Sequence, residues 1–249
     1  MQEIIDATIK ALEDMKRAGV THVEVSRKTL EELGRPEAMV GAASPPRPAQ
    51  NRGGDAAPTS GMAELAVIEA RAKACTKCRE LAGCRHSVVF GVGDPHAELM
   101  FIGEAPGYDE DMKGEPFVGR AGQLLTKIIL AMGFQREEVY IANVLKCRPP
   151  ENRVPEPEEV ANCLPFLLSQ IELVKPKVIV ALGATALRAL LDVQLGITKM
   201  RGNWYTFREI PIMPTFHPAY LLRNPPAKAD VWRDMQAVVK KLGREVPKK

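Results

Sequence analysis

The sequence has no long apolar run, no secretory signal pattern and no strong excess of one charge. No stretch approaches the roughly 18 consecutive apolar residues that cross a membrane, and residues 1–6 lack the basic start and apolar centre of a secretory signal. We therefore expect a cytoplasmic protein with no membrane partner. The formal net charge is +3. Composition thus argues neither for nor against nucleic acid, because only a basic surface local to a site would decide that.

Cysteine is scarce, and its spacing is not that of a disulfide framework. Five cysteines in a reducing compartment rarely pair as disulfides. Cys75 and Cys78 are close enough in sequence for two thiolates to reach one metal centre from a single turn. Cys147 and Cys163 lie far downstream and can join this pair only after folding. Cys84 is left over, and we interpret it as a small buried thiol.

Three regions of the chain differ in composition. Residues 1–34 carry apolar side chains at the spacing of a short amphipathic helix, to which we assign no function. Residues 35–61 are rich in Pro, Ala, Gly and Ser, and such a segment buries too little surface to offset chain entropy. We therefore expect a flexible linker there. Residues 62–249 are long enough for one α/β domain with a sizeable core.

Within residues 62–249, short apolar strands alternate with longer helical segments. This alternation predicts a mostly parallel four-stranded sheet with helices on both faces. No internal repeat is visible. The expected strands cover residues 99–102, 139–145, 178–182 and 210–214, and the expected helices cover residues 62–73, 122–132, 156–174, 184–191 and 230–242.

Residues 99–107 combine a buried strand with a glycine-rich turn. The apolar run 99–102 is followed at once by Gly103-Glu-Ala-Pro-Gly107. In parallel sheets, ligands bind outside the carboxyl ends of the strands, where a glycine-rich turn lets backbone N–H groups approach a substrate. Taken alone, the turn is better interpreted as an acidic, solvated loop after an ordinary strand.

Four motifs follow one another along this domain. They are Gly103-Glu-Ala-Pro-Gly107, Pro116-Phe-Val-Gly-Arg-Ala-Gly-Gln-Leu-Leu125, Asn143-Val-Leu-Lys-Cys-Arg-Pro-Pro150 and His217-Pro-Ala-Tyr-Leu-Leu-Arg-Asn-Pro225. In type and order they resemble the iron-sulfur uracil-DNA glycosylases, family 4 of the uracil-DNA glycosylase superfamily. The resemblance implies a three-layer α/β/α sandwich. It also implies a monofunctional DNA repair enzyme that flips uracil out of DNA, hydrolyses its N-glycosidic bond and leaves an abasic site.

The resemblance assigns a uracil-binding pocket to residues of these motifs. Phe117 resembles the aromatic residue that stacks on uracil, although by sequence alone it reads as a core residue. The amide of Asn143 carries a donor and an acceptor, which match O4 and N3–H of uracil, whereas cytosine presents the reverse pattern. Without the motif, we would interpret this amide as bonded to neighbouring backbone. The turn residues Glu104, Ala105 and Pro106 are expected to line the same pocket.

Two residues are candidates for the chemical step. In the resemblance His217 contacts uracil O2, where a donor stabilises the negative charge of the leaving base. In the best-known branch of the superfamily an Asp orients the catalytic water from the position that Ala105 occupies here, so that acid is missing. Backbone groups of residues 104–107 can hold the water instead, and Glu104 and Glu110 are the candidate carboxylates. We favour Glu104 because it adjoins the strand end.

The last motif resembles the loop that enters the minor groove of DNA. Leu221 or Leu222 can fill the space that the flipped nucleotide leaves, and Arg223 can hold a phosphate. The alternative, a plain connection to the last helix, stays open.

Cys75, Cys78, Cys147 and Cys163 match the ligand positions of the family in type and spacing. Four cysteines are the usual ligands of a [4Fe-4S] cluster, which we expect to be structural, since base hydrolysis needs no redox chemistry. Zinc is the competing assignment. Structural zinc sites usually pair two local clamps, however, whereas the second pair here is separated by roughly 15 residues.

Two other functions stay open at this point. One is a relative that binds uracil-DNA tightly or forms a covalent adduct, but that branch has a Gln in the turn where this chain has Ala105. The other is a non-catalytic iron-sulfur or zinc module that docks on nucleic acid. The expected partners are uracil-containing DNA and downstream repair proteins, and we expect a monomer.

Overall fold

The structure is a computed structural model that describes residues 59–191, 193 and 195–247. The predicted N-terminal extension, residues 1–34, and residues 35–58 of the predicted linker lie outside the described residues. The first described helix, α3, spans Thr59–Lys73 and so begins earlier than the predicted residue 62. Within the described part of the chain, no helix is long and apolar enough to cross a membrane.

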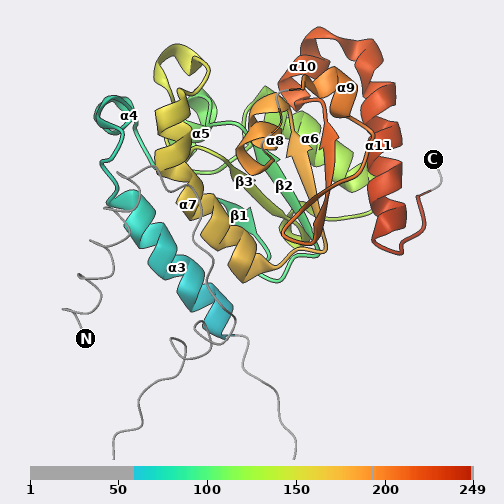
Figure 1. Ribbon diagram of the computed structural model, residues 1–249, viewed down its shortest axis with the longest axis horizontal. Coiled ribbons are helices and arrows are strands. Elements are labelled where there is room, and N and C mark those ends of the chain that lie inside the picture. Colours follow the sequence, from blue (N-terminus) through green and yellow to red (C-terminus); the bar gives the residue numbers. More distant parts are fainter. Residues whose placement is uncertain (1–58, 192, 194, 248–249) are drawn as a thin grey trace, which may run out of the picture. The chain divides into compact units, whose positions relative to one another are not determined.

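A six-stranded sheet forms the centre of the domain, in the order β1-β3-β2-β4-β6-β5 (Figure 1). Its four inner strands run parallel: β3 (Tyr140–Asn143), β2 (Leu99–Gly103), β4 (Val178–Leu182) and β6 (Ile210–Thr215). They are the four predicted strands, so the α/β class and the parallel sheet are confirmed.

The prediction of only four strands is wrong at both edges of the sheet. Strand β1 (Val92–Gly93) pairs antiparallel with β3, and β5 (Tyr205–Phe207) pairs antiparallel with β6. These strands have two and three residues. Such short segments show no period that a sequence pattern can reveal.

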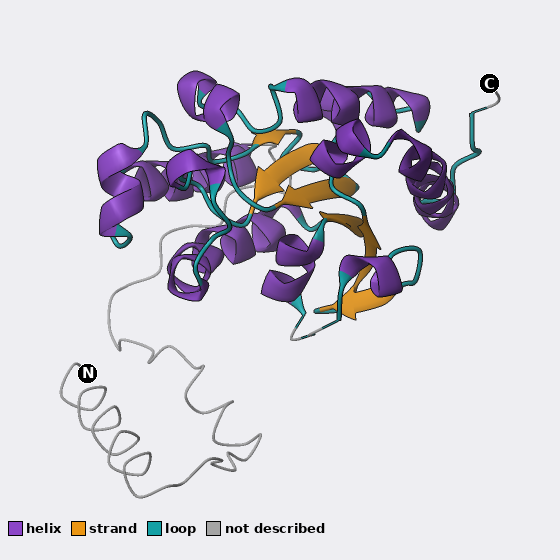
Figure 2. Cartoon of the chain, turned by 90° about the horizontal axis from the view of Figure 1, so that it is seen from above, coloured by secondary structure: helices purple, strands orange, loops and turns teal. Residues whose placement is uncertain are grey.

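Side chains of the inner strands alternate between two faces, and helices cover both. On one face Met100 and Ile102 pack with α3, α7 (Pro157–Val174) and α8 (Ala184–Leu190). On the other face Leu99 and Phe101 pack with α6 (Arg120–Ala131) and α11 (Lys228–Lys241). Figure 2 shows helices on both sides of the strands, as a three-layer sandwich requires. Burial on both faces explains why these strands read as continuous apolar runs.

Short helices that the sequence did not predict occupy the connections. They are α4 (Arg79–Cys84), α5 (Tyr108–Lys113), α9 (Ile197–Met200), α10 (Pro218–Arg223) and the single 3-10 turns η1 (Arg136–Glu138), η2 (Pro150–Asn152) and η3 (Pro225–Ala227). Each is about one or two turns long, too short for a helical period to show.

The four parallel strands end at one edge of the sheet. The register pairs Gly103 at the end of β2 with Asn143 at the end of β3. It also pairs Leu182 at the end of β4 with Thr215 at the end of β6. The segments that follow these strands therefore meet at the edge where parallel sheets bind ligands.

Candidate active site

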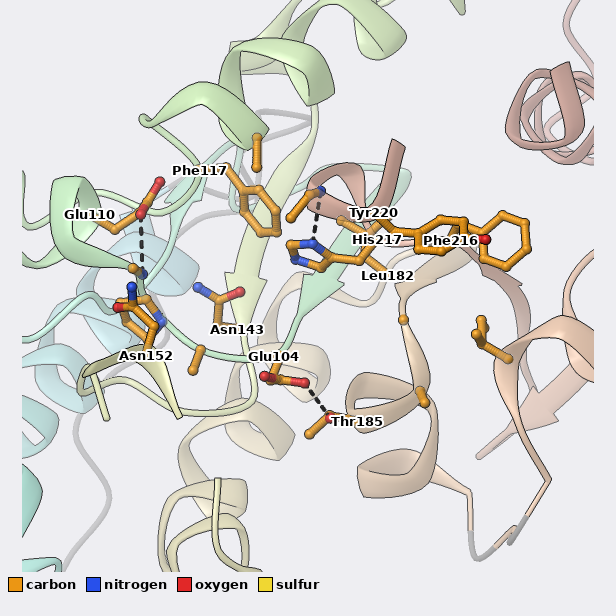
Figure 3. A pocket seen from close by; sticks show the side chains of 18 of the residues that line it. Glu104, Glu110, Phe117, Asn143, Asn152, Leu182, Thr185, Phe216, His217 and Tyr220 are labelled. Carbon is orange, nitrogen blue, oxygen red and sulfur yellow. Dashed lines mark hydrogen bonds between the residues drawn. The ribbon is translucent and has the colours of Figure 1, made fainter. Parts of the chain in front are cut away.

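A cavity of about 630 Å³ opens at this edge of the sheet. Segments after all four parallel strands line it, and Figure 3 shows their side chains converging. Its volume lies within the range of small-molecule sites, about 300–1,000 Å³. The cavity brings together every residue predicted for the uracil pocket, namely Glu104, Ala105, Pro106, Phe117, Asn143 and His217.

Glu110 fixes two of the loops that form the cavity. Its Oε1 accepts hydrogen bonds from the backbone N–H groups of Val118 at 2.9 Å and Gly119 at 2.8 Å. Its Oε2 accepts a third from Gly107 at 3.1 Å. The carboxylate thus ties the turn after β2 to the segment before α6. This structural role occupies Glu110, the second carboxylate candidate, and favours Glu104 for the chemical step.

Phe117 is held in a left-handed backbone conformation, with φ of 54°, and its side chain is buried. Two glycines leave room for it. A Cβ at Gly103 would collide with the Phe117 ring and with Oδ1 of Asn143, and a Cβ at Gly122 would collide with the Phe117 backbone. Glycine at these two positions therefore allows the aromatic ring and the amide to share one pocket.

Asn143 ends β3 with its amide in the pocket. The residue is 2% exposed, and its Oδ1 is the one buried side-chain nitrogen or oxygen of the described residues that has no hydrogen-bond partner. The alternative of an amide bonded to neighbouring backbone is thus wrong for this oxygen. An unpaired buried acceptor costs about 1–3 kcal/mol. A ligand that donates a hydrogen bond here would remove that cost.

A buried lysine supports the main chain of Asn143. Nζ of Lys146 donates to the Asn143 main-chain oxygen at 2.8 Å and to Oε1 of Gln170 at 2.6 Å. Burial lowers the pKa of Lys146 to about 7. Nε2 of Gln170 in turn donates to the Phe90 main-chain oxygen and to the Tyr140 hydroxyl, each at 3.0 Å. This network fixes the strand end that carries the amide.

His217 precedes α10 and lies beside Phe117, with ring centroids 5.6 Å apart. Its Nδ1 accepts a hydrogen bond from the backbone N–H of Ala219 at 3.1 Å, so the neutral ring carries its proton on Nε2. Burial, and to a lesser extent the positive charge of Arg223, lowers the pKa of His217 from 6.5 to about 4. At neutral pH the ring is therefore an uncharged donor.

Glu104 follows β2 and contacts a residue that the sequence analysis missed. Oγ1 of Thr185, in the first turn of α8, donates a hydrogen bond to Oε2 of Glu104 (Figure 3). Both residues line the cavity. Its position in the chain could have indicated this contact, because Thr185 follows β4 closely, and β4 lies next to β2 in the sheet.

Part of the motif predicted to contact DNA forms α10, and the structure separates its two leucines. Leu221 is 0% exposed and packs in the core that α6 and α11 cover. The prediction that Leu221 contacts DNA is therefore wrong. Leu222 is 38% exposed, and Arg223 is exposed and lines the cavity. These two residues remain the candidates for DNA contact, with the exposed Tyr220 beside them.

The four cysteines predicted as metal ligands line a second, smaller cavity: Cys75, Cys78, Cys147 and Cys163. Nη1 of Arg85 donates to Sγ of Cys147 at 3.0 Å, and the backbone N–H of Lys146 donates to Sγ of Cys163 at 3.2 Å. Among the described residues, no three histidine, cysteine or carboxylate side chains are grouped closely enough to share one metal ion. Cys84, predicted to be buried, is exposed and does not line this cavity.

Comparison with known proteins agrees with this arrangement. The uracil DNA glycosylase superfamily model matches residues 90–236. A type-4 uracil-DNA glycosylase of Thermotoga maritima is 52% identical over 164 residues, which cover 64% of this chain and 84% of that protein. A type-4 enzyme of Archaeoglobus fulgidus is 41% identical over 194 residues, or 75% of this chain and 97% of that protein. The chain therefore belongs to the uracil DNA glycosylase superfamily, and within it to the type-4 uracil-DNA glycosylases.

Proposed function

We propose that the cavity at the edge of the sheet binds uracil flipped out of DNA. The chain hydrolyses the bond between this base and deoxyribose and leaves an abasic site. The observation that carries the proposal is the unpaired Oδ1 of Asn143, in a cavity that also contains Phe117 and His217. The activity stated in the names of its relatives supports the same function.

Asn143 provides the choice of base. Its Oδ1 accepts from N3–H of uracil while Nδ2 donates to O4. Cytosine has no proton on N3 and carries an amino group at C4, so both positions would be mismatched. Buried groups would then lie unpaired, which a site of this kind rejects strongly. Phe117 supplies an aromatic ring on which the flipped base can stack.

His217 stabilises the leaving base. As the glycosidic bond lengthens, negative charge develops on uracil and is shared by O2. Nε2–H of the neutral ring donates to this oxygen. The hydrogen bond from Ala219 to Nδ1 holds the ring in that tautomer, so the donor needs no reorganisation during the reaction.

Glu104 orients the water that attacks the sugar. Ala105 offers no carboxylate, whereas Glu104 lines the cavity next to it. Oε2 of Glu104 accepts a hydrogen bond from the Thr185 hydroxyl. None of the described residues donates a hydrogen bond to Oε1. Oε1 is therefore free to accept a hydrogen bond from water. A carboxylate in this place also offsets the positive charge of an oxocarbenium-like sugar.

Glu104→Gln is expected to lower the single-turnover rate of uracil release by about 10²-fold or more, while DNA affinity stays unchanged. The amide keeps the size of the side chain but cannot take the proton of the water. The rate is measured on an oligonucleotide with one uracil, and affinity is measured by fluorescence anisotropy. Glu137→Gln, at an exposed position of η1, is the matched control. An unchanged single-turnover rate would remove Glu104 from the mechanism.

We infer that the four cysteines hold a [4Fe-4S] cluster. They line one cavity. Four thiolates are the usual ligand set of a cubane, in which each iron takes one thiolate, whereas structural zinc sites usually pair two local clamps. Burial raises the pKa of the Cys163 thiol to about 11, so a thiolate there needs a bound cation.

The cluster would have a structural role, with no part in base hydrolysis. Its ligands would join the segment between α3 and α4 to the loop after β3 and to α7. The chain between Cys147 and Cys163 also lines the uracil cavity, through Pro149 and Asn152. Loss of the metal would therefore release one side of that cavity.

Anaerobically purified protein is expected to contain about four irons per chain. Chelation of the iron should lower the melting temperature and abolish uracil release. Cys163→Ser should lose iron, whereas Cys84→Ser, at the exposed cysteine, should retain it. Iron and acid-labile sulfide are assayed together with zinc. One zinc per chain with no iron would contradict the cluster assignment.

We further propose that the chain acts on uracil-containing DNA as a monomer in the cytoplasm, and that downstream repair proteins process the abasic product. Five unpaired cysteines suit a reducing compartment. Sedimentation at the mass of one chain would support the monomer, and a stable dimer would contradict it.

A further inference from the structure

We propose that Thr185 is a positioning residue for the reaction, and that its hydroxyl holds the Glu104 carboxylate in the orientation that the catalytic water requires. This inference rests on the role proposed above for Glu104. It adds a second segment, the start of α8, to the parts of the chain on which the chemical step depends.

The sheet brings the two residues together. Strands β2 and β4 are parallel neighbours, and the register pairs Ile102 with Ala181 just before both strands end. Glu104 directly follows β2, and Thr185 lies in the first turn of α8, after Gly183. In Figure 3 the two side chains point toward each other below Asn143.

The direction of the hydrogen bond is fixed by chemistry. An ionised carboxylate only accepts, so the Thr185 hydroxyl must donate its proton to Oε2 of Glu104. No other hydrogen bond to this carboxylate is formed by the residues that the structure describes. A glutamate side chain that lost this bond would regain several rotamers. Thr185 therefore limits the carboxylate to one orientation, with Oε1 left for water.

The start of α8 is itself tied to the strand that leads to His217. Gly183, with φ of 95°, donates its backbone N–H to the Thr215 main-chain oxygen at 2.9 Å. A Cβ at Gly183 would lie 3.4 Å from Cβ of His217. The contact of Gly183 with the segment from Thr215 to His217 therefore positions two groups together. They are His217, which donates to the leaving base, and Thr185, which holds the Glu104 carboxylate. Such placement matters, because a shift of about 1 Å can reduce an enzyme rate about 10²-fold.

Thr185→Val tests the proposal, because valine keeps the shape of threonine and removes the donor. It is expected to lower the single-turnover rate of uracil release by about 10-fold to 10²-fold without changing DNA affinity. Thr185→Ser keeps the hydroxyl and is expected to restore most of the rate. Thr206→Val, at an exposed position of β5, is the matched control.

The double variant separates this proposal from the role of Glu104. If Thr185 acts through Glu104, adding Thr185→Val to Glu104→Gln should slow release no further than Glu104→Gln alone. Wild-type rates for Thr185→Val beside a slow Glu104→Gln would overturn the proposal and leave the role of Glu104 intact. Full additivity, a loss of DNA affinity, or no rescue by serine would also overturn it. A fast Glu104→Gln would remove both roles.

Discussion

Asn143→Leu is expected to abolish uracil release while leaving the protein at least as stable as the wild type. Leucine has nearly the shape of asparagine, but it can form no hydrogen bond with N3–H or O4 of uracil. A site that loses its hydrogen bonds to a buried ligand discriminates by about 10⁴-fold or more, so the single-turnover rate should fall to that extent. The folded protein meanwhile loses a buried acceptor that has no partner, which favours the folded state.

The two halves of this prediction are measured separately. Single-turnover release gives the chemical effect, and the melting temperature gives the effect on stability. Asn203→Leu, at an exposed asparagine, controls for the substitution itself. A rate within about tenfold of the wild type would contradict the assignment of Asn143 as the group that recognises the base. A large fall in melting temperature would show that the amide has a structural partner.

His217→Asn is expected to lower the single-turnover rate by about 10²-fold to 10³-fold, the usual effect of removing one donor to a developing oxyanion. Asparagine is a good residue at the start of a helix and can replace Nδ1 as acceptor for the Ala219 N–H. It is too short to supply the donor that Nε2 provides. The variant should therefore fold normally. A rate equal to that of the wild type would exclude a contact of His217 with the leaving base.

The same residue predicts a pH dependence of stability. Folded His217 takes up a proton near pH 4, whereas its ordinary pKa is 6.5. Between these values the unfolded chain binds more protons, so the contribution of neutral His217 to the free energy of unfolding is complete above pH 6.5 and is lost as the pH falls toward 4. His217→Asn should flatten this part of the curve, and His96→Asn, at an exposed histidine, should not. Equal slopes for the two variants would contradict the low pKa.

The inner strands of the fold could be predicted because strands buried on both faces consist of continuous apolar residues. Residues 99–102 and 178–182 face helices on both sides and are therefore apolar throughout. The strand ends then located the pocket, since parallel strands place their following residues at one edge. This reasoning pointed to the turn that carries Glu104, and the motif resemblance assigned Asn143 and His217 to the same pocket. The structure brings all three residues to one cavity.

What could not be predicted depends on short segments and on tertiary packing. Strands β1 and β5 are too short to show a period. The choice between Leu221 and Leu222 depends on how the single short helix α10 packs against its neighbours. The Glu110 carboxylate accepts hydrogen bonds from three backbone N–H groups, and these join two loops that come into contact only after folding. The bond from Thr185 to Glu104 likewise forms across two strands.

The most direct test is release of free uracil from an oligonucleotide that contains a single deoxyuridine, beside matched substrates with cytosine, thymine or hypoxanthine. We expect free uracil and an abasic site from the uracil substrate, with no release from cytosine or thymine. Stable protein that binds this DNA but releases no base would contradict it, as would equal release of uracil and cytosine.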